Sequence, residues 1–324
     1  MKKIAVLCSG GDSPGMNACI RAVVQAGHYH GIEIWGVKRG YNGLMDDDFL
    51  PLHTETLGNI IHLGGTILKS ARAPRFMTYE GRAQAFQNLQ KRGMDGLVVI
   101  GGDGSYTGAK IFLQEFPEMK IIGTPGTIDN DLYGTDFTIG YDTAINTAMQ
   151  AIDRLRDTAD SHDRLFFVEV MGRDAGFIAL RSGIGSGADA VLVPETKTDV
   201  DALIAHLESG WNRRKSSMIV IVAEGDDAGG AFEVARKVGE RFKQYDTKVS
   251  ILGHIQRGGS PTCMDRVLAG RLGVAAVEAL KEGKSGFAAG VLHRETVLIP
   301  FEQAIKHNTE LNANLLRLAE ILGY

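Results

Sequence analysis

Short apolar runs alternate with longer stretches of helical periodicity along this 324-residue chain. Runs rich in Val, Ile and Leu are each followed by a glycine-rich turn and then by apolar residues spaced as on one face of a helix. This alternation is typical of a parallel sheet flanked by helices and predicts an α/β fold. We predict strands at Lys3–Cys8, Glu33–Val37, Gly96–Ile100, Lys120–Gly123, Arg164–Val170, Ala190–Val193, Ser217–Val222 and Lys248–Gly253.

Glycine is frequent, with 41 residues, and it gathers behind the predicted strands instead of forming a low-complexity segment. In open α/β sheets ligands bind beyond the carboxyl ends of the strands, and glycine lets backbone N–H groups approach a phosphate. The glycine pattern therefore indicates a binding edge. The length suits about two domains, and a helix-rich block from near Gly140 to near Gly253 suggests where the second one lies.

The charge of the chain argues against nucleic acid as a partner. The net charge is −4, from 35 basic and 39 acidic residues that are interspersed, so the chain has no basic block of the kind that binds a nucleic-acid backbone.

The apolar run Ile4–Leu7 is far shorter than a signal-peptide core or a membrane span. No membrane partner is therefore expected, and a cytoplasmic protein is favoured. Cys8, Cys19 and Cys263 show no CxxC spacing and are expected to be reduced packing residues.

Gly10–Asn17 follows the first predicted strand and precedes a predicted helix, Ala18–Ala26. This order would turn free N–H groups and the positive end of a helix toward a ligand above the sheet. The segment matches neither GxxxxGK[ST] nor GxGxxG, so neither a P-loop nor a dinucleotide fingerprint is indicated. These residues alone are consistent with a phosphate cradle or with an ordinary strand-to-helix turn.

Gly101–Ser105 repeats this order after another apolar strand. Its acidic residue, Asp103, would stand at the strand end, where an unpaired carboxylate is costly. A Mg²⁺ that carries nucleotide phosphates would satisfy it, because magnesium favours one or two carboxylates together with water and phosphate oxygens. Alternatively, Asp103 caps the helix that follows.

Two carboxylates stand two residues apart in Pro125–Asp131, directly after an apolar strand. Acids this close need cations, hydrogen bonds or different protonation states, which suits one of Asp129 and Asp131 as a proton acceptor and the other as a metal ligand or supporting partner. An Asx-rich turn without chemistry is the alternative.

Cationic side chains stand beside glycine-rich segments at three places. Arg72, Arg173 and Arg257 could each contact a phosphate with two hydrogen bonds, although a single arginine is more often a solvated surface residue. His254 could bind a ligand or be a satisfied core histidine.

Seven motifs occur in order across residues 10–261: GGDSPGMN, GGTxxxSAR, GGDGS, PGTIDND, RLRDTAxSH, EVMGRxxG and GHIQRGGSP. With this set the whole chain resembles the bacterial ATP-dependent 6-phosphofructokinases. The resemblance implies the phosphofructokinase fold, an α/β fold of two domains that each contain a mainly parallel sheet with flanking helices. It implies an ATP-binding domain at 1–138 plus 256–304 and a fructose 6-phosphate-binding domain at 139–255 plus 305–324.

The resemblance also implies functional residues at matching positions. ATP would be held by Gly11, Arg72, Ala73, Gly102, Asp103, Gly104 and Ser105, with Mg²⁺ on Asp103. Fructose 6-phosphate would be held by Thr127, Asp129, Arg164, Met171, Gly172, Arg173, Glu224, Lys248, His254 and Arg257.

The implied reaction is in-line transfer of the ATP γ-phosphoryl group to the C1 hydroxyl of the sugar, with positioning and charge stabilisation as the main sources of catalysis. Asp129 would accept the hydroxyl proton, while Thr127 and Arg173 would orient and stabilise the transferring group. The family builds each substrate site across a subunit interface. A homo-oligomer, expected to be a tetramer, follows, with Arg164 and Lys248 reaching a neighbouring subunit.

Two glycines bear on the phosphoryl donor. A branch of the family that uses pyrophosphate typically shows GGDDS and PKTIDND, where this chain has Gly104 and Gly126. An Asp at 104 would crowd the α-phosphate of a nucleotide, and a Lys at 126 would help a bare pyrophosphate, so ATP is expected. A nucleotide-binding sensor on the same fold is a further alternative, but it would be expected to lack Asp103, Asp129 or Arg173.

Some positions depart from the family pattern. Lys248 stands where an Arg is usual, so weaker binding of the 6-phosphate is expected. Met77 stands where relatives often have an Arg near the ATP phosphates. At the family's interfacial effector site, several cationic positions are altered, so weak regulation by ADP or phosphoenolpyruvate is expected. The matching residues are Arg21, Gln25, Thr54, Asn59, Arg156, Asp189, Arg213, Lys215 and Ser217.

Overall fold

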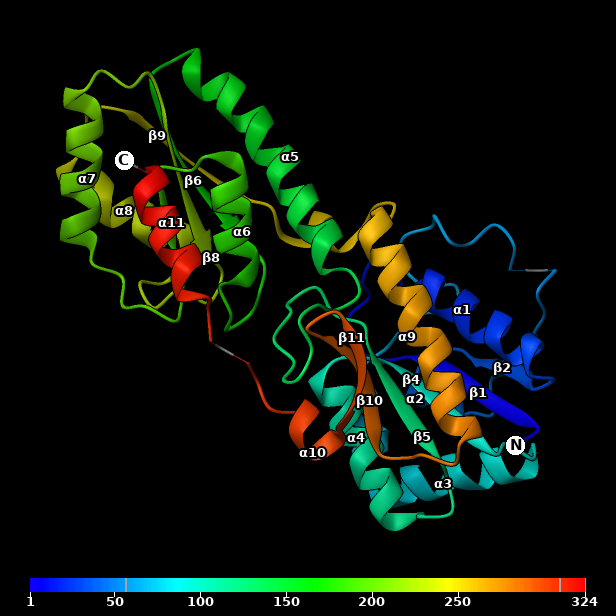
Figure 1. The fold of residues 1–324 in the computed structure, drawn as a ribbon. Helices are drawn as coiled ribbons and strands as arrows, with labels where there is room; N and C mark the ends of the chain where they lie inside the picture. Colours follow the sequence, from blue (N-terminus) through cyan, green and yellow to red (C-terminus); the bar gives the residue numbers. More distant parts are fainter. Residues whose placement is uncertain (56, 309, 324) are drawn as a thin grey trace. The chain divides into compact units, whose positions relative to one another are not determined.

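The computed structural model describes residues 1–55, 57–308 and 310–323. The chain divides into two compact units (Figure 1). Unit 1 comprises Met1–Ile128, Leu132–Thr143 and Arg257–His307, and unit 2 comprises Asp129–Asp131, Ala144–Gln256 and Asn308–Tyr324. The chain thus passes between the two units several times.

Unit 1 is built on a seven-stranded sheet with the order β11-β10-β5-β4-β1-β2-β3. The central strands are parallel, whereas the outer pairs β2/β3 and β10/β11 are antiparallel. Its strands are β1 Lys3–Cys8, β2 Glu33–Val37, β3 Phe49–Leu52, β4 Gly96–Gly101, β5 Ile121–Pro125, β10 Phe287–Leu292 and β11 Glu295–Pro300.

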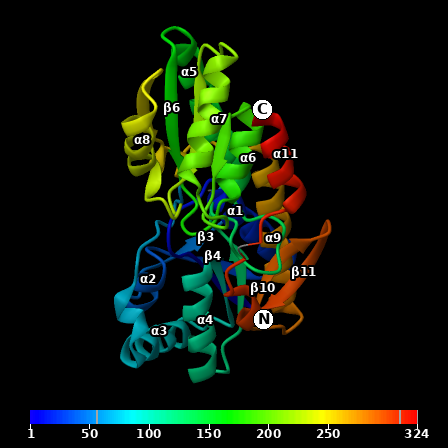
Figure 2. The ribbon, with the colours of Figure 1, turned by 90° about the vertical axis from the view of Figure 1, so that its left-hand side faces the viewer.

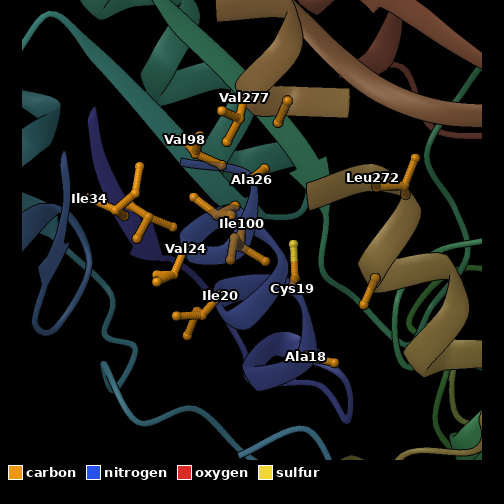
Figure 3. Close-up of a cluster of buried hydrophobic side chains, with 14 of the residues drawn as sticks. Ala18, Cys19, Ile20, Val24, Ala26, Ile34, Val98, Ile100, Leu272 and Val277 are labelled. Atoms are coloured by element: carbon orange, nitrogen blue, oxygen red, sulfur yellow. The ribbon is translucent and has the colours of Figure 1, made fainter. Parts of the chain in front are cut away.

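Helices cover both faces of this sheet, because successive side chains of a strand point to opposite faces. In β1, Ile4, Val6 and Cys8 join the apolar cluster under α1 and α9, while Ala5 and Leu7 join the cluster under α2, α3, α4 and α10. Figure 3 shows the first cluster, with side chains from α1, β4 and α9. The helical segments are α1 Met16–Tyr29, α2 Tyr41–Met45, η1 Pro74–Met77, α3 Tyr79–Lys91, α4 Asp103–Glu115, α9 Cys263–Lys281 and α10 Phe301–Ala304.

Unit 2 contains a four-stranded, wholly parallel sheet with the order β7-β8-β6-β9. Val220 of β8 packs in the cluster with α7 and α8, whereas the next residue, Ile221, faces Gly183 of α6. Helix α11 packs against α6 (Figure 2). The segments are α5 Tyr141–Asp160, β6 Arg164–Val170, α6 Phe177–Ser186, β7 Ala190–Leu192, α7 Val200–Asn212, β8 Met218–Ala223, α8 Gly230–Arg241, β9 Asp246–Ile251, η2 Gly253–Arg257 and α11 Ala313–Gly323.

All eight strands predicted from the sequence are present, with ends that shift by up to two residues, and the α/β fold is confirmed. Three further strands were not predicted. Strand β3 is an edge strand of four residues that contains Pro51, a residue that weakens any strand signal. Strands β10 and β11 form a hairpin whose two turn residues, His293 and Arg294, have φ of +50° and +71°. Such turns usually contain Asn and Gly, so this one leaves no sequence signal.

The cysteines are all free thiols, but the prediction that all three are packing residues is wrong for one of them. Cys8 and Cys19 are buried in the sheet and α1, and burial raises the pKa of each thiol to about 12. Cys263 is exposed at the first turn of α9. Within the described residues, no helix is long and apolar enough to cross a membrane.

Candidate active site

Three neighbouring parallel strands of unit 1, in the order β5-β4-β1, end at the same edge of the sheet. The loops that follow them are the three glycine-containing motifs that begin at Gly10, Gly101 and Pro125. The loops are tied together, since the N–H of Ser9 donates to the carbonyl of Ile100 and that of Gly126 to the carbonyl of Gly101. The structure thus brings these sequence motifs to one edge.

The loop before α1 is held by an asparagine. Nδ2 of Asn17 donates to the carbonyls of Leu63 and Gly64, and its Oδ1 accepts from the N–H of Ile67 at 2.8 Å. Asn17 therefore fastens the GGTxxxSAR segment to the GGDSPGMN segment. The N-cap of α1 is Gly15, with φ of +108°, and no side chain makes a capping hydrogen bond at this end of the helix.

Arg257 lies against the same loop. Its Nη1 donates to the carbonyl of Asp12 at 3.2 Å, and a Cβ at Gly11 would lie only 2.4 Å from that nitrogen. Glycine at position 11 therefore makes room for the guanidinium. Within unit 1 the GHIQRGGSP motif also reaches the GGT segment, since Ser260 Oγ donates to the carbonyl of His62.

Helix α4 begins at Asp103, directly after β4. Its N-cap is Gly102 without a side-chain capping bond, so the alternative that Asp103 is the capping residue is not the arrangement found. The Asp103 carboxylate is 28% exposed, and its Oδ2 lies 3.5 Å from Nε2 of His307. Tyr41 supports the turn from below, because its hydroxyl donates to the carbonyl of Ser105 at 2.6 Å. The start of α4 is thus a fixed turn with an accessible carboxylate.

His307 was not identified from the sequence. It is a lone histidine behind α10, some two hundred residues from Asp103, and it belongs to none of the seven motifs. An isolated β-bridge between Leu132 and His307 brings it to this place. Only the fold reveals it as a partner of the Asp103 carboxylate.

Gly104 and Gly126 differ in what surrounds them. Apart from its two chain neighbours and the backbone of its own helix, no atom of the described residues lies within 4 Å of a Cβ built at Gly104, so packing does not require glycine there. A Cβ at Gly126 would lie 2.9 Å from Cγ2 of Ile100 and 3.0 Å from Cε of Met16. The space beside Gly104 is open to a ligand, whereas Gly126 is also required by the packing of β4 and α1.

Arg72 and Ala73 lie on the segment that leads into η1. The Arg72 side chain is exposed, and its carbonyl accepts a hydrogen bond from Nδ2 of Asn42 at 3.0 Å. Ala73 is the N-cap of η1. Met77, at the end of η1, is 82% exposed, so this position contributes neither charge nor packing.

Asp129 and Arg173 meet in unit 2. Asp129 is 2% exposed, and its Oδ2 lies 3.6 Å from Nε of Arg173, whose side chain is 53% exposed. Asn130, next to Asp129, has φ of +57°, a left-handed conformation that Asn tolerates better than most residues. Asp131 is also buried, and its carbonyl accepts from the N–H of Asn308 at 2.7 Å. The buried carboxylate of Asp129 and the accessible guanidinium of Arg173 therefore lie next to each other.

The loop after β6 is held by the residue that follows β8. Oε1 of Glu224 accepts from the N–H groups of Gly172 and Arg173, at 3.1 and 2.7 Å. Met171 donates its N–H to Oε1 of Gln256, which is fully buried in η2. Gly225 is required here, since a Cβ would lie 2.1 Å from the carbonyl oxygen of Arg173.

His254 is exposed in η2, which rules out the alternative that it is a core histidine. Gln256, two residues further, is the buried polar residue of this motif. His254 and Gln256 differ in exposure because the segment turns tightly. The side that carries Gln256 packs against the loop after β6, and the side that carries His254 is open.

Arg164 and Lys248 come together at one end of the β6/β9 pair. Nζ of Lys248 lies 2.9 Å from Oδ1 of Asp246, and Nε of Arg164 lies 3.6 Å from Oδ2 of the same carboxylate. Nη1 of Arg164 also donates to Oγ1 of Thr158 at 2.8 Å. Hydrogen bonding to Lys248 lowers the pKa of Asp246. The two cations thus form one cluster around a single carboxylate.

The positions of the expected effector site divide between the units. Arg21 and Gln25 lie on α1 in unit 1, whereas Arg156, Asp189, Arg213 and Lys215 belong to unit 2. Nζ of Lys215 lies 2.8 Å from Oδ1 of Asp189, whose Oδ2 accepts from the N–H of Ile219. Nη2 of Arg156 donates to the carbonyls of Ser186 and Gly187 at the end of α6. Lys215 and Arg156 therefore already have partners within their own unit.

Comparison with known proteins is consistent with this arrangement. The sequence model of the phosphofructokinase family matches residues 3–280. The chain is 53% identical over 323 residues to an ATP-dependent 6-phosphofructokinase of Cytophaga hutchinsonii, with 100% of this chain and 98% of the relative covered.

Solved structures show the same fold. A phosphofructokinase from Saccharomyces cerevisiae has a TM-score of 0.90 and 38% identity, with 94% of this chain and 45% of that chain covered. A pyrophosphate-dependent phosphofructokinase from Marinobacter aquaeolei has a TM-score of 0.85 at 20% identity, covering 99% and 91% of the two chains, a likeness of fold alone. On the family match and the full-length relative, the chain belongs to the phosphofructokinase family.

Proposed function

We propose that this chain transfers the γ-phosphoryl group of ATP to the C1 hydroxyl of fructose 6-phosphate, giving fructose 1,6-bisphosphate and ADP, a step of glycolysis. The pair Asp129 and Arg173 carries this proposal, because a buried carboxylate lies 3.6 Å from an accessible guanidinium directly after β5. Such a pair combines a proton acceptor with a cation suited to a phosphoryl group. The family and the full-length relative support the same reaction.

The donor is proposed to bind in the domain formed by 1–138 plus 256–304. Two helix starts without side-chain caps, those of α1 and α4, supply N–H groups for phosphate oxygens. Arg72 is exposed and able to reach an anion. The proposed ATP-binding residues are Gly11, Arg72, Ala73, Gly102, Asp103, Gly104 and Ser105.

Mg²⁺ fits this donor set through Asp103. The carboxylate is accessible, and the described residues contain no cluster of three or more His, Cys, Asp or Glu that would form an all-protein metal cage. One carboxylate together with phosphate oxygens is the kind of site that magnesium favours. When bound, Mg²⁺ offsets the negative charge on the phosphates.

Fructose 6-phosphate is proposed to bind in the domain formed by 139–255 plus 305–324. Glu224 fixes the backbone of the Met171–Arg173 loop, and exposed His254 is available to a polar ligand. The proposed residues are Thr127, Asp129, Arg164, Met171, Gly172, Arg173, Glu224, Lys248, His254 and Arg257.

In the proposed mechanism, Asp129 accepts the proton of the C1 hydroxyl as the oxygen attacks the γ-phosphorus, whose bond to the bridging oxygen of ADP breaks. Arg173 stabilises the charge that develops on the transferring group, and Thr127 orients it. Asp131, buried two residues further along the same loop, supports that loop electrostatically. Catalysis then depends mainly on the positions of these side chains relative to the substrates, and the Pro125–Asp131 loop must hold them firmly.

The cluster of Arg164, Lys248 and Asp246 is proposed to serve a neighbouring subunit of a homotetramer. Lys248 is 46% exposed and Arg164 23%, so the lysine is the more accessible cation of the two. Contact with a 6-phosphate would compete with Asp246 for Lys248. The protein is proposed to act in the cytoplasm.

The experiment that tests the function offers purified protein fructose 6-phosphate and Mg²⁺ with either ATP or pyrophosphate, and follows fructose 1,6-bisphosphate. Turnover with ATP alone is expected, because Gly104 leaves open space for a nucleotide. Turnover with pyrophosphate alone would show that the protein is a pyrophosphate-dependent phosphofructokinase. Absence of turnover with both donors would refute the enzymatic function and favour a nucleotide-binding sensor.

A further inference from the structure

A buried segment, Thr138–Thr143, lies between the Pro125–Asp131 loop and the body of α5 and has no part in the function proposed above. It is paired with the loop at two points. The N–H of Ile139 donates to the carbonyl of Pro125 at 2.7 Å, and Oγ1 of Thr138 donates to the carbonyl of Thr127 at 2.6 Å. Both bonds join residues of unit 1. The loop that carries the proposed chemistry is therefore fastened from a neighbouring segment.

The hydrogen bond from Thr138 acts on the backbone of a residue proposed to take part in the reaction. The carbonyl of Thr127 belongs to the peptide that joins Thr127 to Ile128, and Ile128 is the residue directly before Asp129. On the other side, the N–H of Gly126 donates to the carbonyl of Gly101 at 3.1 Å. Because this peptide is planar, it can turn only through changes in ψ of Thr127 and φ of Ile128. The hydrogen bond from the Thr138 hydroxyl thus restrains the backbone at Thr127, a residue proposed to orient the transferring group.

The segment itself is anchored by Asp265 of α9, which is 1% exposed. Oδ1 of Asp265 accepts from the N–H of Gly140 at 2.8 Å, and its Oδ2 accepts from the N–H and the hydroxyl of Thr143 at 2.8 and 2.5 Å. In return, Oγ1 of Thr262 donates to Oδ2 of Asp142 at 2.6 Å. Burial raises the pKa of the Asp265 carboxyl. The starts of α5 and α9 therefore hold each other.

The conformation of the segment leaves little alternative packing. Gly140 has φ of +107°, and a Cβ there would lie 2.6 Å from Cβ of Ser13. Gly15 likewise has φ of +108°, and a Cβ would lie 2.7 Å from Cγ2 of Ile139. Both glycines permit a close approach between this segment and the loop before α1. Asp265, the Thr138–Thr143 segment and the loop before α1 are therefore closely packed against one another.

We propose that Thr138 is a positioning residue of the reaction, which fixes the Thr127 backbone through its hydroxyl. Asp265 of α9 holds the segment that carries Thr138 through Gly140 and Thr143. Thr138 itself touches no substrate in this account and acts through Thr127. The inference rests on the proposed function, in which Thr127 orients the transferring group. Because small displacements of a positioned group slow a reaction strongly, the loss should fall on kcat.

The test compares Thr138→Val, which keeps the shape and removes the hydroxyl, with Thr138→Ser, which keeps the hydroxyl. We expect Thr138→Val to lower kcat about tenfold or more, with both KM values within about threefold of the parent, since one hydrogen bond commonly contributes that much. Thr138→Ser should retain kcat within about twofold to threefold. A folded Thr138→Val enzyme with the parental kcat, or a Ser variant as slow as the Val variant, would overturn the proposal.

Amide hydrogen exchange gives a second readout that does not depend on activity. In Thr138→Val, and in Asp265→Asn, the amides of residues 126–131 should exchange faster than in the parent, while Thr138→Ser should leave them unchanged. If the parent enzyme shows no turnover, the proposed function fails, and exchange alone then decides whether Thr138 holds the loop. Unchanged exchange in both Thr138→Val and Asp265→Asn would refute the positioning role.

Discussion

Glu224 holds the backbone of Arg173: its Oε1 accepts from the Arg173 N–H at 2.7 Å and from the preceding N–H of Gly172 at 3.1 Å. Arg173 has φ of +52°, a left-handed conformation that costs a non-glycine residue about 1–2 kcal/mol. The two hydrogen bonds offset part of this cost. The guanidinium that faces Asp129 is thus placed by an acid more than fifty positions away, at the end of a different strand.

Replacement of Glu224 separates its acceptor role from its charge. Glu224→Ala removes the acceptor for both N–H groups, so we expect kcat/KM for fructose 6-phosphate to fall by about 10- to 100-fold. Glu224→Gln keeps an oxygen at the same place and should lose less than about fivefold. Steady-state kinetics of the two variants measure the difference. Equal losses in both would mean that the charge of Glu224, and not its position as acceptor, matters.

Asp129→Asn tests the proton acceptor. The substitution keeps the size of the side chain but removes its ability to take up a proton, so kcat should fall by at least about 10²-fold. Binding of fructose 6-phosphate, measured by calorimetry, should change much less. A variant whose kcat stays within a few-fold of the parent would remove Asp129 from this role.

Lys248→Arg tests the cluster around Asp246. An arginine can contact a phosphate with two parallel hydrogen bonds where a lysine offers a point charge, so the KM for fructose 6-phosphate should fall while kcat stays nearly constant. The structure adds a competing interaction, because Nζ of Lys248 lies 2.9 Å from Asp246. Asp246→Asn is the matched control, and it should lower KM by releasing Lys248. A KM that is unchanged or raised in Lys248→Arg would show that Lys248 does not contact the substrate phosphate.

Regulation by anionic effectors should be weak. Of the expected cationic positions, Gln25, Thr54 and Ser217 lack a charge, and Lys215 is engaged by Asp189 at 2.8 Å. We expect millimolar phosphoenolpyruvate or ADP to shift the half-saturating concentration of fructose 6-phosphate by less than about fivefold, a coupling below about 1 kcal/mol. Saturation curves at near-neutral pH with and without each ligand measure the shift. A tenfold increase with phosphoenolpyruvate that ADP reverses would contradict this expectation.

Much of the site is encoded locally and could be predicted. Gly10–Asn17, Gly101–Ser105 and Pro125–Asp131 each follow a strong apolar strand, and parallel strands bring their carboxyl ends to one edge. The continuous apolar run of β1 is buried on both faces, as expected for a strand of a parallel sheet flanked by helices. These features depend on neighbours along the chain.

The sequence by itself therefore determined the α/β fold and the residues at the ends of the central strands, whose spacing is a local property. Only the tertiary structure decided which distant groups support them: His307 beside Asp103, Glu224 under Arg173, and Thr138 and Asp265 behind Thr127. It also decided that Cys263 is exposed and that a His-Arg turn closes β10 and β11. Hydrogen bonds between residues far apart in sequence leave no periodic pattern, because the position of one partner is fixed only when the strands and helices between them have packed.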